Sequence, residues 1–150
     1  MFGSLVRQWK RKQPAAKADW LIGRDIMGPG TRAKALRTFK AEKAFENDPN
    51  LGTDPQPKHL KDKYTGTADA GGVHINSGIP NHAFYLVAME LGGNAWEKAG
   101  RIWYRTMLAL TRTSDFRQMV DMSMQNAAGL FGAGSIEEKA VARAWKAVGF

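Results

Sequence analysis

The stretch Ser77–Gly93, with the sequence SGIPNHAFYLVAMELGG, carries the clearest helix signal in the chain. Ser77 is a favoured N-cap residue, and Pro80 is suited to the first helical turn, where its missing N–H costs nothing. Glycines 92 and 93 end the segment. The apolar residues between these signals predict a packed helix over 77–91; they are Ala83, Phe84, Leu86 and Val87.

Three further helices are expected after this one, over 94–110, 115–131 and 135–148. Their apolar residues recur at helical spacing, which is typical of a core-facing stripe rather than of a cofactor site. Asn94-x-x-Glu97 and Ser135-x-x-Glu138 resemble capping signals at two of the starts. The glycine-rich links at 92–93 and 132–134 are short, so consecutive helices should run antiparallel.

The first 64 residues are organised differently. An amphipathic helix is predicted over 2–13 and ends at Pro14, whereas 19–64 contains most of the six prolines and several glycines. We expect mostly irregular chain there, interrupted by a short helix over 33–45. The sequence therefore predicts one all-α domain over 1–150, a compact bundle of about five to six helices with a long irregular N-terminal loop region.

Composition limits the classes of function. The 150 residues include 43% hydrophobic and 24% charged residues, no cysteine and no apolar run near 18 residues, so we expect no disulfide and no membrane partner. The formal charge of +8 would suit nucleic acid, but the basic residues are spread out and no recognition motif accompanies them. We therefore expect no nucleic-acid partner. The N-terminus does not have the pattern of a secretion signal, and the compartment stays unknown.

One polar segment carries the residues for chemistry, the stretch TGTADAGGVHINSG over 65–78. Asp69 precedes His74 by five residues, and Gly71 and Gly72 permit a bend that would let the two side chains meet. A carboxylate bonded to an imidazole selects its tautomer and favours the charged ring. Such a histidine can donate to an oxyanion forming on a substrate carbonyl. By spacing alone, a structural Asp–His pair is the more common interpretation.

The local sequence adds a resemblance. Asp69-x-Gly-Gly-Val-His74-x-Asn-Ser-Gly-Ile closely resembles the segment with the active-site histidine of the thermolysin family of zinc endopeptidases. Asp54-Pro55-Gln56-Pro57 and Ile79-Pro80-Asn81 are similar to its protealysin-like branch. The resemblance covers nearly the whole chain, with further matching segments at 2–6, 19–23, 35–37, 64–67, 81–86, 100–105, 113–116 and 144–149.

The resemblance implies a role for four residues. His74 would bond the oxyanion of the tetrahedral intermediate, and Asp69 would orient it. Arg37 would bind the substrate carbonyl near the primed-side pocket, and Leu36 would form part of that pocket's wall. Ala70 departs from the family's asparagine, which holds the peptide backbone, and this difference should weaken substrate binding.

The residues for the family's metals are missing. Zinc binding in the family needs a His-Glu-x-x-His helix and a further glutamate, but this chain has only His59, His74 and His82 at unsuitable spacing. We expect no metal ligand in this chain, and zinc only in the intact family by resemblance. Calcium is also not expected, because cations or apolar residues replace the family's acids and only Asp19 remains; the replacements are Arg7, Leu21, Arg24 and Lys34.

The sequence thus predicts the C-terminal helical domain of a thermolysin-like zinc metalloendopeptidase, inactive by itself because the zinc ligands and the general base are missing. Its expected partners are a peptide or protein substrate and the N-terminal peptidase half. The alternative is a non-catalytic module that binds a peptide or a protein. The first helix would normally pack against the other half, so self-association through Phe2, Leu5 and Trp9 is expected as well.

Overall fold

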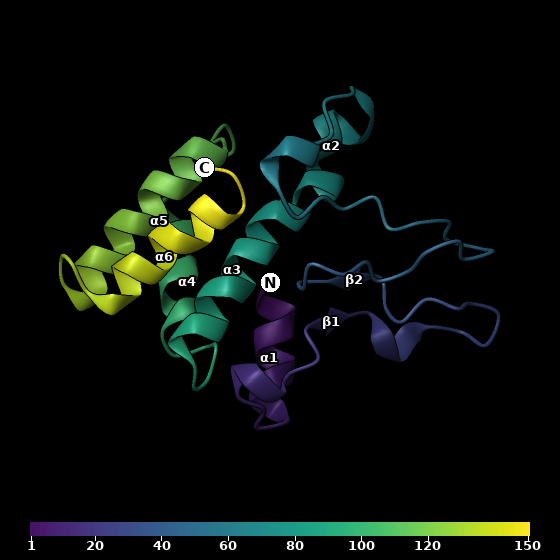
Figure 1. Ribbon diagram of the computed structural model, residues 1–150, viewed down its shortest axis with the longest axis horizontal. Coiled ribbons are helices and arrows are strands. Elements are labelled where there is room, and N and C mark those ends of the chain that lie inside the picture. The colour runs from purple at the N-terminus through teal and green to yellow at the C-terminus, as the bar shows by residue number, and fades with distance from the viewer.

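The computed structural model describes residues 1–150 and confirms the predicted all-α fold with an irregular N-terminal region (Figure 1). No helix is both long and apolar enough to cross a bilayer. A two-stranded sheet is the only addition to the helices. The α-helices are α1 Phe2–Lys10, α2 Ala68–Asn76, α3 Gly78–Leu91, α4 Ala99–Ala109, α5 Phe116–Phe131 and α6 Ile136–Ala147.

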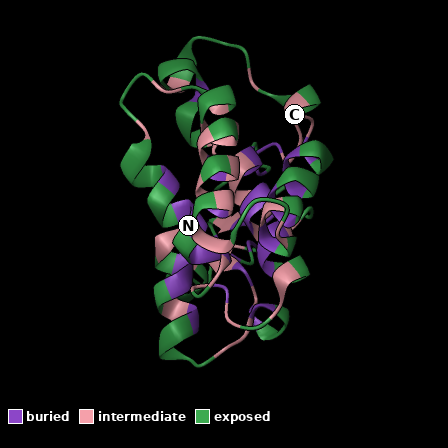
Figure 2. Cartoon of the chain, turned by 90° about the vertical axis from the view of Figure 1, so that its left-hand side faces the viewer, coloured by how far each residue is buried: buried purple, intermediate pink, exposed green.

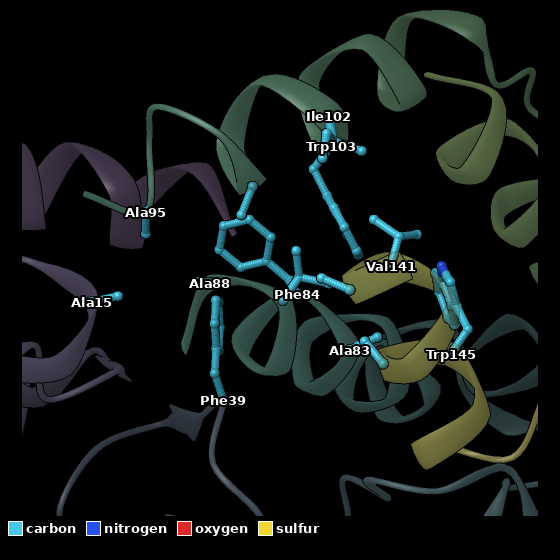
Figure 3. Close-up of a cluster of buried hydrophobic side chains, with 14 of the residues drawn as sticks. Ala15, Phe39, Ala83, Phe84, Ala88, Ala95, Ile102, Trp103, Val141 and Trp145 are labelled. Atoms are coloured by element: carbon cyan, nitrogen blue, oxygen red, sulfur yellow. The ribbon is translucent and has the colours of Figure 1, made fainter. Parts of the chain in front are cut away.

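Helix α3 lies between two layers. Helices α4 and α6 pack on one side of it, and the irregular N-terminal segment packs on the other (Figures 1 and 3). Phe84 reaches both layers, because its ring lies 5.3 Å from that of Trp103 in α4 and 6.0 Å from that of Trp20. Buried residues lie on the sides of the helices that face one another (Figure 2). The expectation of a packed, apolar helix at this place is confirmed.

Two helix starts agree with the predicted capping only in part. At α6 the Ser135 hydroxyl accepts from the Glu138 N–H, but the Glu138 carboxylate bonds the Gly134 N–H rather than that of Ser135. Helix α4 begins at Ala99, five residues later than predicted for 94, because 94–98 form turns in which the Asn94 amide donates to Glu97. Backbone bonds close these turns, from the Glu97 N–H to the Asn94 carbonyl oxygen and from the Gly100 N–H to the Ala95 carbonyl oxygen.

The predicted helix over 33–45 is wrong. This part of the chain instead contains strand β2 (Arg37–Thr38), which pairs antiparallel with β1 (Leu21–Ile22) in the register Leu21 to Thr38. Two buried carboxylates take up the backbone donors: Asp48 accepts from the N–H groups of residues 32 and 33, and Asp54 accepts from that of residue 44. Short 3-10 helices, at Ala15–Lys17, Arg24–Ile26 and Leu60–Asp62, complete the segment.

Helix α1 packs on α4 through Leu5 and Phe2, and not through all of the apolar residues on its predicted apolar face. Leu5 is only 7% exposed and lies against Gly100, where an added Cβ would come within 3.1 Å of the leucine Cδ1. Phe2 packs edge-on against Tyr104. Val6 and Trp9, by contrast, are 63% and 65% exposed. The expectation that Leu5 belongs to an exposed apolar face is therefore wrong, whereas that for Trp9 is confirmed.

Replacing Phe84 by alanine should lower the free energy of unfolding by about 3–5 kcal/mol, because the cavity would open between both layers at once. The measurement is urea unfolding followed by circular dichroism. Met89 on the same helix is 38% exposed, so Met89→Ala is the matched control and should change stability by less than about 0.5 kcal/mol. Equal losses for the two variants would contradict this account of the core.

Candidate functional site

The site begins with a reversal of the backbone at residues 69–72. All four have positive φ: 55° at Asp69, 48° at Ala70, 80° at Gly71 and 79° at Gly72. Glycine adopts this region freely, but a residue with a Cβ is strained by about 1–2 kcal/mol. Gly72 is required for space as well, since an added Cβ would approach the Tyr64 ring to 2.5 Å. The reversal turns the Asp69 carboxylate back towards the following helical turns.

Asp69 and His74 form the predicted pair. Asp69 Oδ1 lies 2.5 Å from His74 Nδ1, and Asp69 Oδ2 accepts from the N–H groups of His74 (2.8 Å) and Ile75 (3.2 Å). The bond from the His74 ring is the main reason why the pKa of Asp69 is lowered. Because the ionised carboxylate requires a donor at Nδ1, the ring is oriented and its tautomer selected. The His74 side chain is 75% exposed, which leaves Nε2 available to a ligand.

Arg37 lies beside this pair although it is 37 residues away from His74 in the sequence. Its Nη1 donates to Ser77 Oγ at 2.9 Å and to the His74 carbonyl oxygen at 3.3 Å. Pairing of β1 with β2 sets the position of Arg37. Leu36, 39% exposed, lies against Gly23, where an added Cβ would be 2.8 Å from the leucine Cγ. The structure thus brings Arg37 to the Asp69–His74 pair. Leu36 directly precedes Arg37 in the chain.

Two hollows border the site. One of about 360 Å³ lies along α2 and the start of α5, and one of about 180 Å³ lies between the start of α1 and helices α3 and α4. The Met1 amino group is at the second; burial and, secondly, the charge of Arg37 lower its pKa. Both hollows share Ser77 and several apolar residues, namely Pro80, Leu110 and Met119. The amino-terminal end of α1 therefore points at the candidate site.

The histidines do not form a metal site. His82 Nδ1 bonds the Phe39 carbonyl oxygen at 2.7 Å and its ring stacks on Tyr85, while burial lowers its pKa. His82 therefore packs between α3 and the irregular segment rather than facing solvent. His59 Nδ1 accepts from the Lys61 N–H. No three histidine, cysteine, aspartate or glutamate side chains gather closely enough to hold a metal ion, so the residues present do not fit zinc.

Guanidinium groups surround Asp19, the one acid that remains of the family's expected calcium ligands. Arg7 Nη1 lies 2.6 and 2.8 Å from its two carboxylate oxygens, and Arg24 lies 3.5 Å away. Burial alone would raise the pKa of Asp19, but bonds from the Leu21 N–H and from Arg7 outweigh it and lower the pKa. Because Arg7 already supplies the positive charge, these residues do not fit a hard cation.

Comparison with known proteins shows the family of the chain. The family described as thermolysin metallopeptidase, alpha-helical domain, matches residues 1–150. The chain belongs to this family. It is 44% identical over 153 residues to protease PrtS of Photorhabdus sp. (strain Az29), and 42% identical over 151 residues to an extracellular metalloprotease of Pectobacterium carotovorum subsp. carotovorum. Each alignment covers 99% of this chain, but only 41% and 43% of those relatives.

A solved structure shows the same relation. The precursor of protealysin, a metalloproteinase from Serratia proteamaculans, superposes with a TM-score of 0.92 at 48% identity, over 99% of this chain and 46% of that one. The chain is thus the C-terminal helical domain of a thermolysin-like metallopeptidase and spans less than half the length of these relatives. The expected family and fold are confirmed.

Sequence motifs did not single out two residues of this neighbourhood. Gln56 donates from Nε2 to the His74 carbonyl oxygen at 2.7 Å, although it comes from the proline-rich loop. Ser77, predicted only as a helix cap, donates from Oγ to the same oxygen at 2.8 Å. For Gln56, the sequence offered two signals of a role at the site. It stands between two prolines, and it belongs to the DPQP segment that resembles the family.

Replacing Asp69 by asparagine should lower the thermal midpoint at about pH 5 to 7. The folded-state pKa of Asp69 is depressed, so its contribution is present above the ordinary value of 3.8 and is lost as pH falls through the folded value. The difference between the wild type and Asp69→Asn should therefore shrink in acid, which a series of calorimetric scans would measure. Asp121→Asn changes an exposed carboxylate on α5 and serves as the control. A difference that persists unchanged in acid would contradict the prediction.

Proposed function

We propose that residues 1–150 form one domain that supplies the oxyanion-binding and substrate-binding wall of a zinc metalloendopeptidase. The observation that carries this proposal is the Asp69–His74 pair, in which Nδ1 is occupied and the ring is exposed, while the Arg37 guanidinium bonds the His74 carbonyl oxygen. The N-terminal half of the enzyme would complete the cleft. Membership of the thermolysin family supports peptides or proteins as substrates.

Each of the four residues has a part in this proposal. The Asp69 carboxylate holds Nδ1–H and leaves Nε2 free, and a proton on Nε2 would be donated in a hydrogen bond to the oxyanion that develops on the scissile carbonyl. Such a preorganised donor is worth about 10²–10³ in rate. Arg37 is held at Nη1 and offers its remaining N–H groups to a substrate carbonyl oxygen. Leu36 provides apolar surface next to it.

The chemical step needs groups that this chain does not contain. In the intact family, zinc supplies the activated water and polarises the carbonyl. No cluster here can hold a metal, and the His-Glu-x-x-His segment that carries the family's general base does not occur in these residues. Residues 1–150 alone would therefore bind and orient the substrate without cleaving it. The extracellular relative supports an extracellular location for the whole enzyme.

The apolar rim around the site supports the N-terminal half as partner. Val73 and Met107 are 56% and 45% exposed, and each borders one of the two hollows next to Ser77. Exposed apolar side chains that rim a site are typical of an interface. The charge of +8 would favour an acidic half.

Purified residues 1–150 with zinc should not cleave a peptide, whereas a mixture with the N-terminal half of a close relative should. In the mixture, His74→Ala should lower kcat/KM about 10²–10³-fold, because a donor to the oxyanion is lost. A fluorogenic peptide assay measures both effects. His59→Ala, remote from the pair, is the matched control. Zinc-dependent cleavage by the 150 residues alone would overturn the proposed division of labour.

A non-catalytic module that binds peptide or protein remains the second candidate, and the exposed side chains of Val6 and Trp9 favour it. Both lie on α1, away from the face that contacts α4, and they are flanked by Lys10 and Arg11. The same surface would support self-association. It excludes Leu5 and most of Phe2, which pack inward.

If α1 mediates self-association, Trp9→Asp should convert a dimer into a folded monomer, because the charge would lie in the interface. Leu5→Asp should instead unfold the protein, since it would place an unpaired charge in the core. Sedimentation velocity and circular dichroism separate the two results. If the wild-type protein is monomeric at high concentration, the hypothesis of self-association is contradicted.

A further inference from the structure

The carbonyl oxygen of His74 is surrounded by donors. Gln56 Nε2 lies 2.7 Å away, Ser77 Oγ 2.8 Å and Arg37 Nη1 3.3 Å. These donors come from a loop, a helix junction and a strand that are distant in sequence. We propose that Gln56 is a positioning residue, which fixes the peptide of His74 and thereby the place of its imidazole relative to Asp69 and Arg37. This inference rests on the proposed function of His74.

The loop that carries Gln56 is itself fixed. Pro55 and Pro57 restrict the backbone on either side, and the Gln56 N–H donates to Asp54 Oδ1 at 3.0 Å. Asp54, 1% exposed, also accepts from the Ala44 N–H. Gln56 is therefore held by the irregular segment and not by the helices that it contacts.

The same loop presses on the start of α3. An added Cβ at Gly78 would come within 2.4 Å of the Pro57 carbonyl oxygen and 3.0 Å of Gln56 Cβ. Only glycine allows this approach, which brings the Gln56 side chain under the turn between α2 and α3. At 9% exposure, its amide is protected from water that would compete for the His74 carbonyl.

The chemistry requires the amide to act as a donor. Nε2 faces two oxygens, the His74 carbonyl at 2.7 Å and Ser77 Oγ at 3.4 Å. The reverse orientation would place Oε1 against the carbonyl oxygen, acceptor against acceptor. Oε1 instead lies buried without a partner. The amide is therefore oriented with Nε2 towards the His74 carbonyl oxygen, which is the orientation that a positioning role needs.

Gln56 also affects Arg37. Because Gln56 and Ser77 make the two short bonds to the His74 carbonyl oxygen, the guanidinium contact with it is longer, at 3.3 Å. Arg37 makes its hydrogen bonds within the chain through Nη1 only. Its other donors stay available for a substrate carbonyl. Loss of the Gln56 donor would let Arg37 move closer to the His74 carbonyl oxygen and away from the cleft.

The test uses Gln56→Glu, which keeps the shape but removes the donor, and Gln56→Met, which keeps the length without polarity. Nitrogen-detected NMR of the histidine rings in the 150-residue protein reports the tautomer of His74 and the exchange of its Nδ1 proton with water. We expect that exchange to quicken about tenfold in both variants, the factor equivalent to 1.4 kcal/mol. His59 and His82 should keep their wild-type signals.

Two comparisons complete the test. Gln125→Glu makes the same chemical change at an exposed site on α5 and should leave His74 unchanged. Asp69→Asn should abolish the protected Nδ1 proton. If Asp69→Asn does so but both Gln56 variants resemble the wild type, the positioning role is overturned and the proposed function stands. If neither position affects His74, the proposed pair fails as well. Equal changes at all three histidines would mean general loosening and would overturn the inference.

Discussion

The burial of α3 on two opposite sides is the constraint on which the rest of the structure depends. A helix flanked by layers needs a broad apolar face, and Ala83, Phe84, Val87 and Ala88 provide it at less than 2% exposure. The site follows from this arrangement, because the start of α3 lies where the helical layer meets the irregular segment. His74 arrives from the helical side of that junction and Arg37 from the irregular side.

Local strain at this junction is offset by a small number of polar contacts. The positive φ angles at Asp69 and Ala70 are unfavourable, yet they let one carboxylate bond a ring nitrogen and two backbone N–H groups. The Gln56, Ser77 and Arg37 donors then hold the next peptide group. The exposed imidazole is thus oriented by groups that are themselves well anchored, as a preorganised oxyanion donor requires.

The charged contacts of α1 join it to the strand region. Arg7 bonds the Asp19 carboxylate and the Leu21 carbonyl oxygen, and so joins the first helix to the strand region. A guanidinium presents fixed donors to a carboxylate, whereas a hard cation needs several oxygen ligands in one place. Arg7 therefore supplies the positive charge beside the Asp19 carboxylate and contacts it through hydrogen bonds.

The sequence by itself determined the helices of the C-terminal part, because the apolar spacing and glycine stops around 77–93 are local signals. It also indicated the Asp69–His74 pair, since a spacing of five residues with two glycines permits the bend, although the left-handed backbone at Asp69 and Ala70 was not evident from the sequence. Only the tertiary structure decided the path of 33–45, where Arg37–Thr38 pairs with the distant strand β1 and the carboxylate of Asp54 takes the Ala44 N–H that a helix would use. It alone placed Gln56 under His74 and buried Leu5, because both positions depend on contacts between segments that no local pattern relates.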